Sequence, residues 1–131
     1  MKATLGRIVI LVEDYDNAFE FYKNNFNCEK IFDSAVSENL RFMHIRFNGD
    51  ESSGIWFLKA ETEEEKSLVG RQTGEQPLLV IYTDDCNAFY NLVIENGTKI
   101  LEPIESDGNS RYFHCADLYG NRITVVELQF F

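Results

Sequence analysis

The chain has 131 residues, of which 44% are hydrophobic and 14% aromatic, so it can bury the core of one compact unit or of two small halves that share a core. Its formal net charge of −10 argues against nucleic-acid binding, which requires a basic footprint. No run of about 18 apolar residues is present, so we expect no membrane span.

The cysteines and the first residues indicate the compartment. Cys28, Cys86 and Cys115 are an odd number at wide spacing, which argues against a disulfide framework and fits a reducing environment. The stretch from Met1 to Arg7 contains no apolar signal-peptide core. We therefore expect a cytoplasmic protein.

The first half of the chain predicts a strand, a helix and three further strands. A β-branched run at 7–13 is typical of a buried strand, and residues 15–26 carry apolar side chains at helical spacing. Strands are predicted at 28–36, 40–48 and 54–59. Either Asp14 or Asp16 is suited to cap the helix.

A polar, acidic stretch at 60–76 separates the two halves. It includes the run from Glu61 to Glu65 and two glycines, so we predict a solvated linker loop. An acidic surface of this kind attracts cationic ligands.

The second half repeats the order of elements. The predicted elements are a strand at 77–83, a helix at 86–96 capped by Asp84, and strands at 98–104, 110–116 and 122–129.

Sequence matches support an internal repeat. Arg41-Phe42-x-His44 recurs 70 residues later as Arg111-Tyr112-x-His114, and Asn17-Ala18-Phe19 recurs as Asn87-Ala88-Phe89. We therefore predict an α+β fold of two βαβββ modules related by an internal pseudo-two-fold, with mixed sheets that curl around a groove. The whole chain, 1–131, forms one domain, with module one at 5–59, the linker at 60–76 and module two at 77–131.

Two motifs carry a resemblance to a known family. Val12-x-Asp14 precedes a helix that contains Ala18 and Phe21-Tyr22, and Asp117-x-x-Gly120-Asn121 precedes the last strand. With the paired modules, these motifs resemble the vicinal oxygen chelate superfamily, which includes glyoxalase I, bleomycin-resistance proteins and extradiol dioxygenases. Leu118 stands where that family usually has proline.

The resemblance also implies where a divalent metal would be held. The corresponding positions are Arg7, Pro77 or Leu78, the strand around Trp56, and Thr124, and none of these offers the usual histidine or carboxylate ligand. We therefore expect a member without the family metal centre and without a cofactor.

Eight residues are candidates for a ligand site in the groove. Arg7 is a permanent cation that favours an anionic or carbonyl group, although an arginine at a strand start also suits solvent. His44 and His114 are repeat-related and form either a shared polar pair or part of the sheet surface, and we expect no carboxylate beside them. The aromatic candidates, which would stack a planar ligand or simply fill the core, are Phe42, Trp56, Tyr82 and Tyr112, and Thr124 completes the set.

These expectations favour a homodimeric, small-molecule-binding protein of the bleomycin-resistance type that sequesters its ligand. One alternative is a metal-dependent lyase, isomerase or dioxygenase with a displaced metal site built on His44 and His114. Another is a structural or regulatory relative that has lost its ligand.

Overall fold

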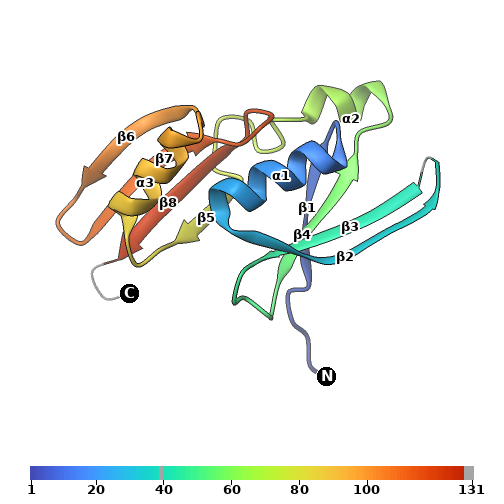
Figure 1. Ribbon diagram of the computed structural model, residues 1–131, viewed down its shortest axis with the longest axis horizontal. Coiled ribbons are helices and arrows are strands. Elements are labelled where there is room, and N and C mark those ends of the chain that lie inside the picture. The colour runs from blue at the N-terminus through green and yellow to red at the C-terminus, as the bar shows by residue number, and fades with distance from the viewer. Residues whose placement is uncertain (39, 129–131) are drawn as a thin grey trace. The chain divides into compact units, whose positions relative to one another are not determined.

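The computed structural model describes residues 1–38 and 40–128. The chain divides into two compact units, unit 1 from Met1 to Val69 and unit 2 from Gly70 onward. Each unit contains a mixed four-stranded sheet with one helix packed on it (Figure 1). This confirms the predicted α+β class with two repeated βαβββ modules.

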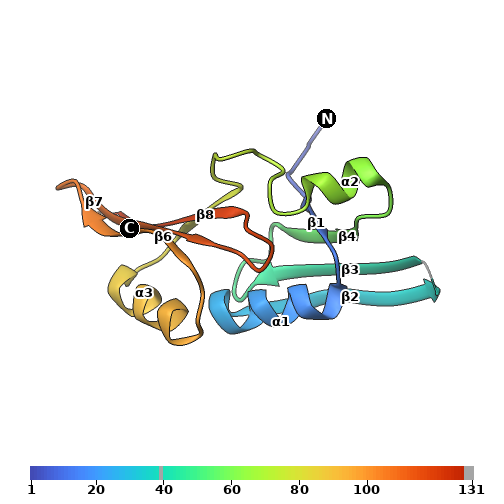
Figure 2. The same cartoon turned by 90° about the horizontal axis from the view of Figure 1, so that it is seen from above.

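Unit 1 is built around a sheet with the strand order β1-β4-β3-β2. β1 and β4 run parallel, and the other neighbours are antiparallel. Figure 2 shows α1 lying along one face of this sheet. The elements are β1 (Arg7–Val12), α1 (Tyr15–Phe26), β2 (Cys28–Ser37), β3 (Leu40–Phe47) and β4 (Gly54–Lys59).

Local side chains fix the ends and the inner face of α1. Asp14 is its N-cap and accepts the backbone N–H of Asn17 at 2.8 Å. Asn27 ends the helix in the left-handed conformation, with a φ of 57°. Tyr22 is 1% exposed and packs edge-on against Phe57 of β4, with 5.4 Å between the ring centroids.

Unit 2 has the equivalent strand order, β5-β8-β7-β6, with β5 and β8 parallel. In α3, Tyr90 packs against Phe113 of β7, with ring centroids 5.1 Å apart. The N-cap of α3 is Asp85, so the prediction of Asp84 was wrong by one residue. Its elements are β5 (Leu79–Tyr82), α3 (Cys86–Glu95), β6 (Ile100–Ser106), β7 (Ser110–Ala116) and β8 (Arg122–Leu128).

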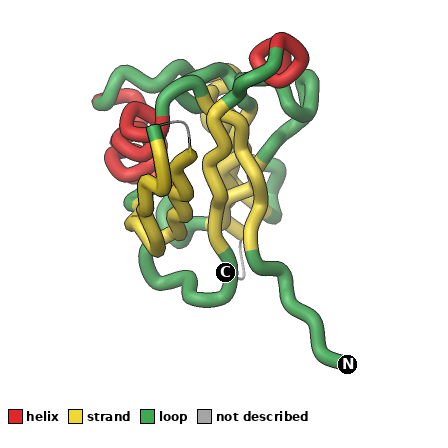
Figure 3. The backbone as a smooth tube through the Cα atoms, turned by 90° about the vertical axis from the view of Figure 1, so that its right-hand side faces the viewer, coloured by secondary structure: helices red, strands yellow, loops and turns green. Residues whose placement is uncertain are grey.

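The prediction of a loop throughout 60–76 was wrong, because α2 (Glu63–Leu68) lies within it. Thr62 accepts the backbone N–H of Glu65, and the Glu65 carboxylate accepts the N–H of Thr62, which forms a capping box. No residue of α2 is buried, so the acidic run is solvated as expected but is helical. None of the described helices is long and apolar enough to cross a membrane. Residues 1–6 precede β1 without regular structure (Figure 3).

Side chains alternate between the two faces of each sheet, so the helix covers one face and leaves the other helix-free. The helix-covered faces hold the core, including Ile10, Val12, Met43, Ile45, Ile55 and Phe57 in unit 1, and Leu79, Ile81, Phe113, Cys115, Ile123 and Val125 in unit 2. By register, the helix-free face of unit 1 carries Arg7, Val9, Phe32, Phe42, His44, Arg46 and Trp56. The helix-free face of unit 2 carries Val80, Tyr82, Glu102, Tyr112, His114, Arg122, Thr124 and Val126.

The Asp117–Asn121 turn joins β7 to β8 and is held by one carboxylate. Asp117 Oδ1 accepts the backbone N–H groups of Tyr119, Gly120 and Asn121 at 3.0, 3.1 and 2.9 Å. Its Oδ2 accepts the Asn121 side-chain amide at 2.9 Å, and Gly120 supplies a φ of 108°. Asp117 is only 5% exposed and Asn121 2%, so water would replace the carboxylate poorly, above all at the buried N–H of Asn121.

Replacing Asp117 with Ala should lower the free energy of unfolding by about 2–4 kcal/mol, because three backbone donors lose a charged acceptor in a buried turn. Asp107→Ala is the matched control. Asp107 also accepts two backbone N–H groups, from Asn109 and Ser110, but it is fully exposed and water can replace it, so we expect a much smaller loss. Urea unfolding followed by circular dichroism would measure both, and equal losses would contradict this account.

Candidate ligand-binding faces

Four of the predicted site residues lie together on the helix-free face of unit 1. His44 and Trp56 are direct cross-strand partners, with ring centroids 5.2 Å apart. Phe42, two residues before His44 on β3, also lies beside the indole, with 6.3 Å between the ring centroids. Arg7, on β1, reaches the histidine from the far side of β4. These four side chains form a continuous aromatic surface with a cation at its edge.

The contact between Arg7 and His44 defines the state of the imidazole. Arg7 Nε donates a hydrogen bond of 3.0 Å to His44 Nδ1. Since the guanidinium keeps its proton, Nδ1 must be the unprotonated nitrogen, and the neutral ring carries its hydrogen on Nε2. Burial, and then the Arg7 charge, lower the pKa of His44 from its ordinary value of 6.5. His44 therefore offers an N–H donor on a neutral ring.

Two local features shape the surroundings of this pair. Gly54 lies opposite Arg7 in the sheet, and a Cβ there would lie 3.4 Å from Arg7 Cδ and 2.5 Å from the Ile45 carbonyl oxygen. Glycine thus leaves the room in which Arg7 turns toward His44. In addition, the Nε1 atom of Trp56 is buried and has no hydrogen-bond partner among the described residues.

Phe32 belongs to the same surface and was missed by the sequence analysis. Its ring lies 6.1 Å from that of His44, edge-on, and the residue is 51% exposed. Strict alternation would place Phe32 on the same face as Lys30, which faces α1 and lies over the Phe19 ring. A register shift between Lys30 and Phe32 turns the phenylalanine to the helix-free face instead.

The helix-free face of unit 2 brings together Tyr112, His114 and Thr124. His114 and Thr124 are direct cross-strand partners, and the Tyr112 ring lies 5.9 Å from the imidazole, edge-on. Tyr82 lies two strands away from His114 on β5, beside Val126 of β8, and is 57% exposed. All four candidates in unit 2 therefore share one face, but Tyr82 is set apart from the other three.

A carboxylate lies beside His114, so the expectation that the histidines lack one was wrong. His114 Nε2 is 3.2 Å from Glu102 Oε2, and Nδ1 is 2.8 Å from Thr124 Oγ1. Because a carboxylate can only accept, the neutral ring donates from Nε2 and accepts the Thr124 hydroxyl proton at Nδ1. Glu102 is held in turn by Arg122 Nη2 at 3.1 Å.

Charges around His114 act in opposite directions on its pKa. Burial and the Arg122 charge lower the pKa of His114 from its ordinary value of 6.5, and the smaller effects of Glu102 and Glu105 raise it. His114 is therefore neutral at pH 7 and keeps the hydrogen-bond pattern given above. Its side chain is 15% exposed.

The two histidines occupy equivalent positions in their own sheets. His44 lies between Phe32 and Trp56, whereas His114 lies between Glu102 and Thr124. A register shift precedes Phe32 in β2, and another precedes Glu102 in β6. The same framework thus carries an aromatic row in unit 1 and a polar row in unit 2.

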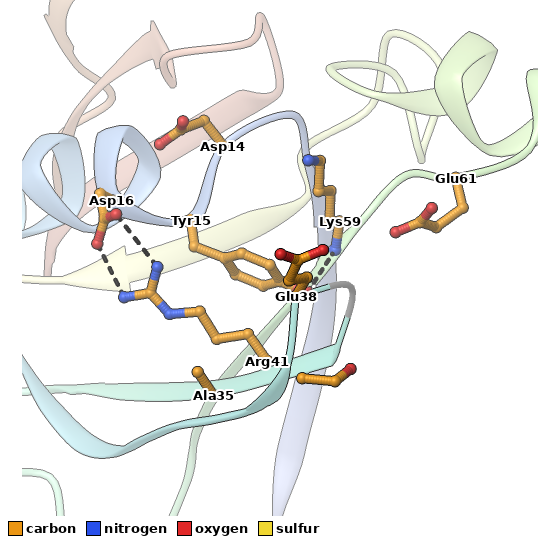
Figure 4. A pocket seen from close by; sticks show the side chains of 9 residues that line it. Asp14, Tyr15, Asp16, Ala35, Glu38, Arg41, Lys59 and Glu61 are labelled. Carbon is orange, nitrogen blue, oxygen red and sulfur yellow. Dashed lines mark hydrogen bonds and ion pairs between the residues drawn. The ribbon is translucent and has the colours of Figure 1, made fainter.

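A separate cavity of about 410 Å³ lies near the N-terminus of α1, on the helix side of the sheet of unit 1 (Figure 4). Arg41 crosses it, bonded to Asp16 at 2.8 Å and to Asp33 at 2.9 Å, so its charge is already compensated. These contacts hold the pKa of Asp33 far below its ordinary value. The lining is mostly polar, unlike the apolar lining typical of small-molecule sites.

Cys115 does not join His114 in a reactive pair. Alternation directs it to the helix-covered face, where it is 0% exposed, and burial raises the pKa of its thiol to about 12. Glu127 also lies on the helix side, and its carboxylate accepts the backbone N–H of Cys86 at the start of α3.

Comparison with known proteins identifies the family. The family model described as "Glyoxalase/Bleomycin resistance protein/Dioxygenase superfamily" matches residues 4–125. The chain belongs to this superfamily. The resemblance to the vicinal oxygen chelate proteins, based on the motifs around Asp14 and Asp117, is therefore confirmed.

One relative in sequence and several solved structures match this chain over almost their whole length. A protein of Shewanella frigidimarina (strain NCIMB 400) is 28% identical over 129 residues, which cover 98% of this chain and 96% of the relative. The structure of UcmS2 matches with a TM-score of 0.83 at 19% identity, covering 96% and 98% of the two chains. TnmS3, an antibiotic binding protein from Streptomyces sp. CB03234, gives 0.79 at 16% identity and covers 98% of both chains. The fosfomycin resistance protein FosX from Listeria monocytogenes gives 0.73 at 17%, covering 97% and 94%.

The divalent metal of many superfamily enzymes does not fit the residues found here. At the positions where the resemblance implies ligands, Arg7 is a cation bonded to His44, Trp56 offers an N–H, and Thr124 is bonded to His114. Within residues 1–38 and 40–128, no group of three or more His, Cys, Asp or Glu side chains could hold a metal ion. Hard and borderline cations need several such donors that converge.

The charge balance at His114 can be tested by NMR, since the chain has only two histidines. Glu102→Gln removes a charge that raises the pKa of His114, so the measured pKa should fall, whereas Arg122→Gln should raise it. The pH titration of the imidazole Cε1–H signals would measure both, with His114→Asn assigning the peak. Glu95→Gln makes the same charge change on the exposed surface of α3 and should leave the pKa unchanged, and an unaltered pKa in Glu102→Gln would exclude the pairing with His114 in solution.

Proposed function

We propose that the chain binds a planar aromatic small molecule on the helix-free face of unit 1 and sequesters it without transforming it. The observation that carries this proposal is the aromatic row formed by Phe32, Phe42 and Trp56 around a neutral His44. Phe32 in particular is half-exposed, and its solvent-exposed apolar surface contributes little to the stability of a folded monomer. Aromatic faces of this kind stack planar ligands, and each contact contributes about 0.5–1.5 kcal/mol beyond burial of area.

The polar groups on the same face suit binding better than chemistry. His44 has its Nδ1 lone pair occupied by Arg7, so it lacks a free base that could remove a proton from a ligand. The metal required by the lyase, isomerase and dioxygenase alternatives has no suitable donor set among the described residues of either unit. The description of TnmS3 as an antibiotic binding protein supports the proposal that this chain binds a small molecule.

The helix-free face of unit 2 holds the remaining candidate ligand-binding residues. Tyr82 and Tyr112 are its aromatic candidates, and the His114–Thr124 pair provides polar ones. We also propose that the protein is a cytoplasmic homodimer. Cys28, Cys86 and Cys115 are all free and buried, which suits a reducing compartment, and sedimentation velocity would test the dimer.

Trp56 is the single tryptophan of the chain and therefore reports directly on this face. Titration with 1-anilinonaphthalene, a planar uncharged probe, should quench Trp56 emission in a saturable manner. Phe42→Ala should weaken this binding about tenfold, because it removes one aromatic wall. Phe19→Ala is the matched control, since Phe19 belongs to α1 on the opposite side of the sheet.

Bleomycin and fosfomycin extend the test to compounds associated with the superfamily. Mass spectrometry of the compounds recovered after incubation should show no change in mass, and a new product would support an enzyme instead. If no probe alters Trp56 emission or the melting temperature, the proposal is wrong and a relative without a ligand is favoured.

A further inference from the structure

We infer that the helix-free face of unit 1 selects aromatic ligands that carry an anionic or strongly hydrogen-bond-accepting oxygen. This inference rests on the proposed function and adds the polarity of the ligand. It runs against the net charge of −10, which by itself favours a cation.

The charge of Arg7 is not compensated by a carboxylate of any described residue. Arg41, Arg46 and Arg122 are each paired with a carboxylate at 2.8–3.1 Å. Arg7 takes part in no ion pair with any described residue, and it donates hydrogen bonds to the neutral His44 ring and the Gly6 carbonyl oxygen. These bonds use Nε and Nη1, so the Nη2 amino group remains available to a ligand.

The charge of the surrounding surface does not cancel that of Arg7. By register, the charged side chains on the helix-free face of the unit 1 sheet are Arg7, Arg46 and Glu29. Arg46 and Glu29 form an ion pair of 2.8 Å, so their charges neutralise each other. The many acidic residues of unit 1 lie elsewhere. For example, Asp16 and Asp33 are on the α1 side, where they bind Arg41. Locally, this face therefore carries one net positive charge.

His44 adds a directed donor to that charge. Its Nδ1 is fixed as an acceptor by Arg7, so Nε2 must carry the hydrogen, and no described residue accepts from it. The lowered pKa keeps the ring in this neutral tautomer at pH 7. Arg7 thus supplies the positive charge and also fixes the tautomer of His44, because the hydrogen bond at one ring nitrogen decides which nitrogen carries the hydrogen.

Trp56 provides a third hydrogen-bond donor on this face. Its indole N–H is buried without an acceptor among the described residues, although such donors usually have one. A ligand oxygen would reach this covered atom only after the ring turns, so Arg7 and His44 carry the selectivity. All three groups are donors, and no described residue accepts a hydrogen bond from His44 Nε2 or Trp56 Nε1.

A matched pair of dyes tests this directly. 8-Anilinonaphthalene-1-sulfonate and 1-anilinonaphthalene share the same ring system and differ by one sulfonate. In the full-length wild-type protein, the sulfonated dye should bind more tightly, with Trp56 emission quenched in both titrations. Arg7→Met and His44→Phe should each reduce the ratio of the two affinities about tenfold, because each removes a donor that the sulfonate can use and the uncharged dye cannot. Arg7→Lys should restore part of the ratio.

Arg71→Met controls for total charge, because it removes the same charge from an exposed position in unit 2. It should leave the ratio unchanged. Thermal melting by circular dichroism verifies that each variant is folded, and Arg7→Gln replaces Arg7→Met if the latter is not.

The outcomes separate the two levels of the argument. If neither dye binds, the proposed function fails. If both bind but the ratio is insensitive to Arg7 and His44, binding stands and the inference about ligand polarity is overturned. Equal effects of Arg7→Met and Arg71→Met would also overturn it, because total charge would then explain the preference.

Discussion

The packing of one helix against one face of each sheet determines which side chains are left for binding. Tyr22 of α1 and Tyr90 of α3 each pack on a strand aromatic, and the alternate positions of the strands must then point the other way. A register slip of one residue would bury His44 or His114 and expose the core, so the hydrophobic pattern that stabilises the fold also fixes the candidate site. The candidate binding residues on β1, β3 and β4 are therefore as well specified as the core itself.

This constraint explains what the sequence could predict. Alternation along regular strands is a local property, and it was sufficient to place Arg7, Phe42, His44 and Trp56 on one face. It failed at Phe32 and Glu102, because each follows a register shift that reverses the alternation. A bulge in an edge strand depends on pairing with the neighbouring strand, and no residue pattern in either segment indicated it. The hydrogen bond between Arg7 and His44 was likewise invisible, since it joins residues 37 positions apart.

The local motifs differed in how far the sequence alone could predict them. Asp117-x-x-Gly120-Asn121 was recognised by its resemblance to the family, and the structure gives the physical reason for its spacing, since one carboxylate accepts three backbone N–H groups. Asp85, in contrast, was confused with its neighbour Asp84, because either carboxylate suits a helix start and only the backbone conformation decides. The acidic run after β4 hid a helix for a similar reason. Its capping box was present in the sequence, but the absence of an apolar stripe favoured a loop.

The two units have the same strand framework but place different side chains around the equivalent histidine. The histidine is common to both, and its neutral state has the same main cause, burial, assisted by a nearby arginine. Its cross-strand neighbours differ: aromatic rings beside His44 provide surface for stacking, whereas Glu102 and Thr124 bind both nitrogens of His114. Both nitrogens of His114 are thus engaged within unit 2, while Nε2 of His44 has no acceptor among the described residues. The net charge of the chain says nothing about this difference, because screening over about 8–10 Å makes the nearest uncompensated group, Arg7, more important than distant carboxylates.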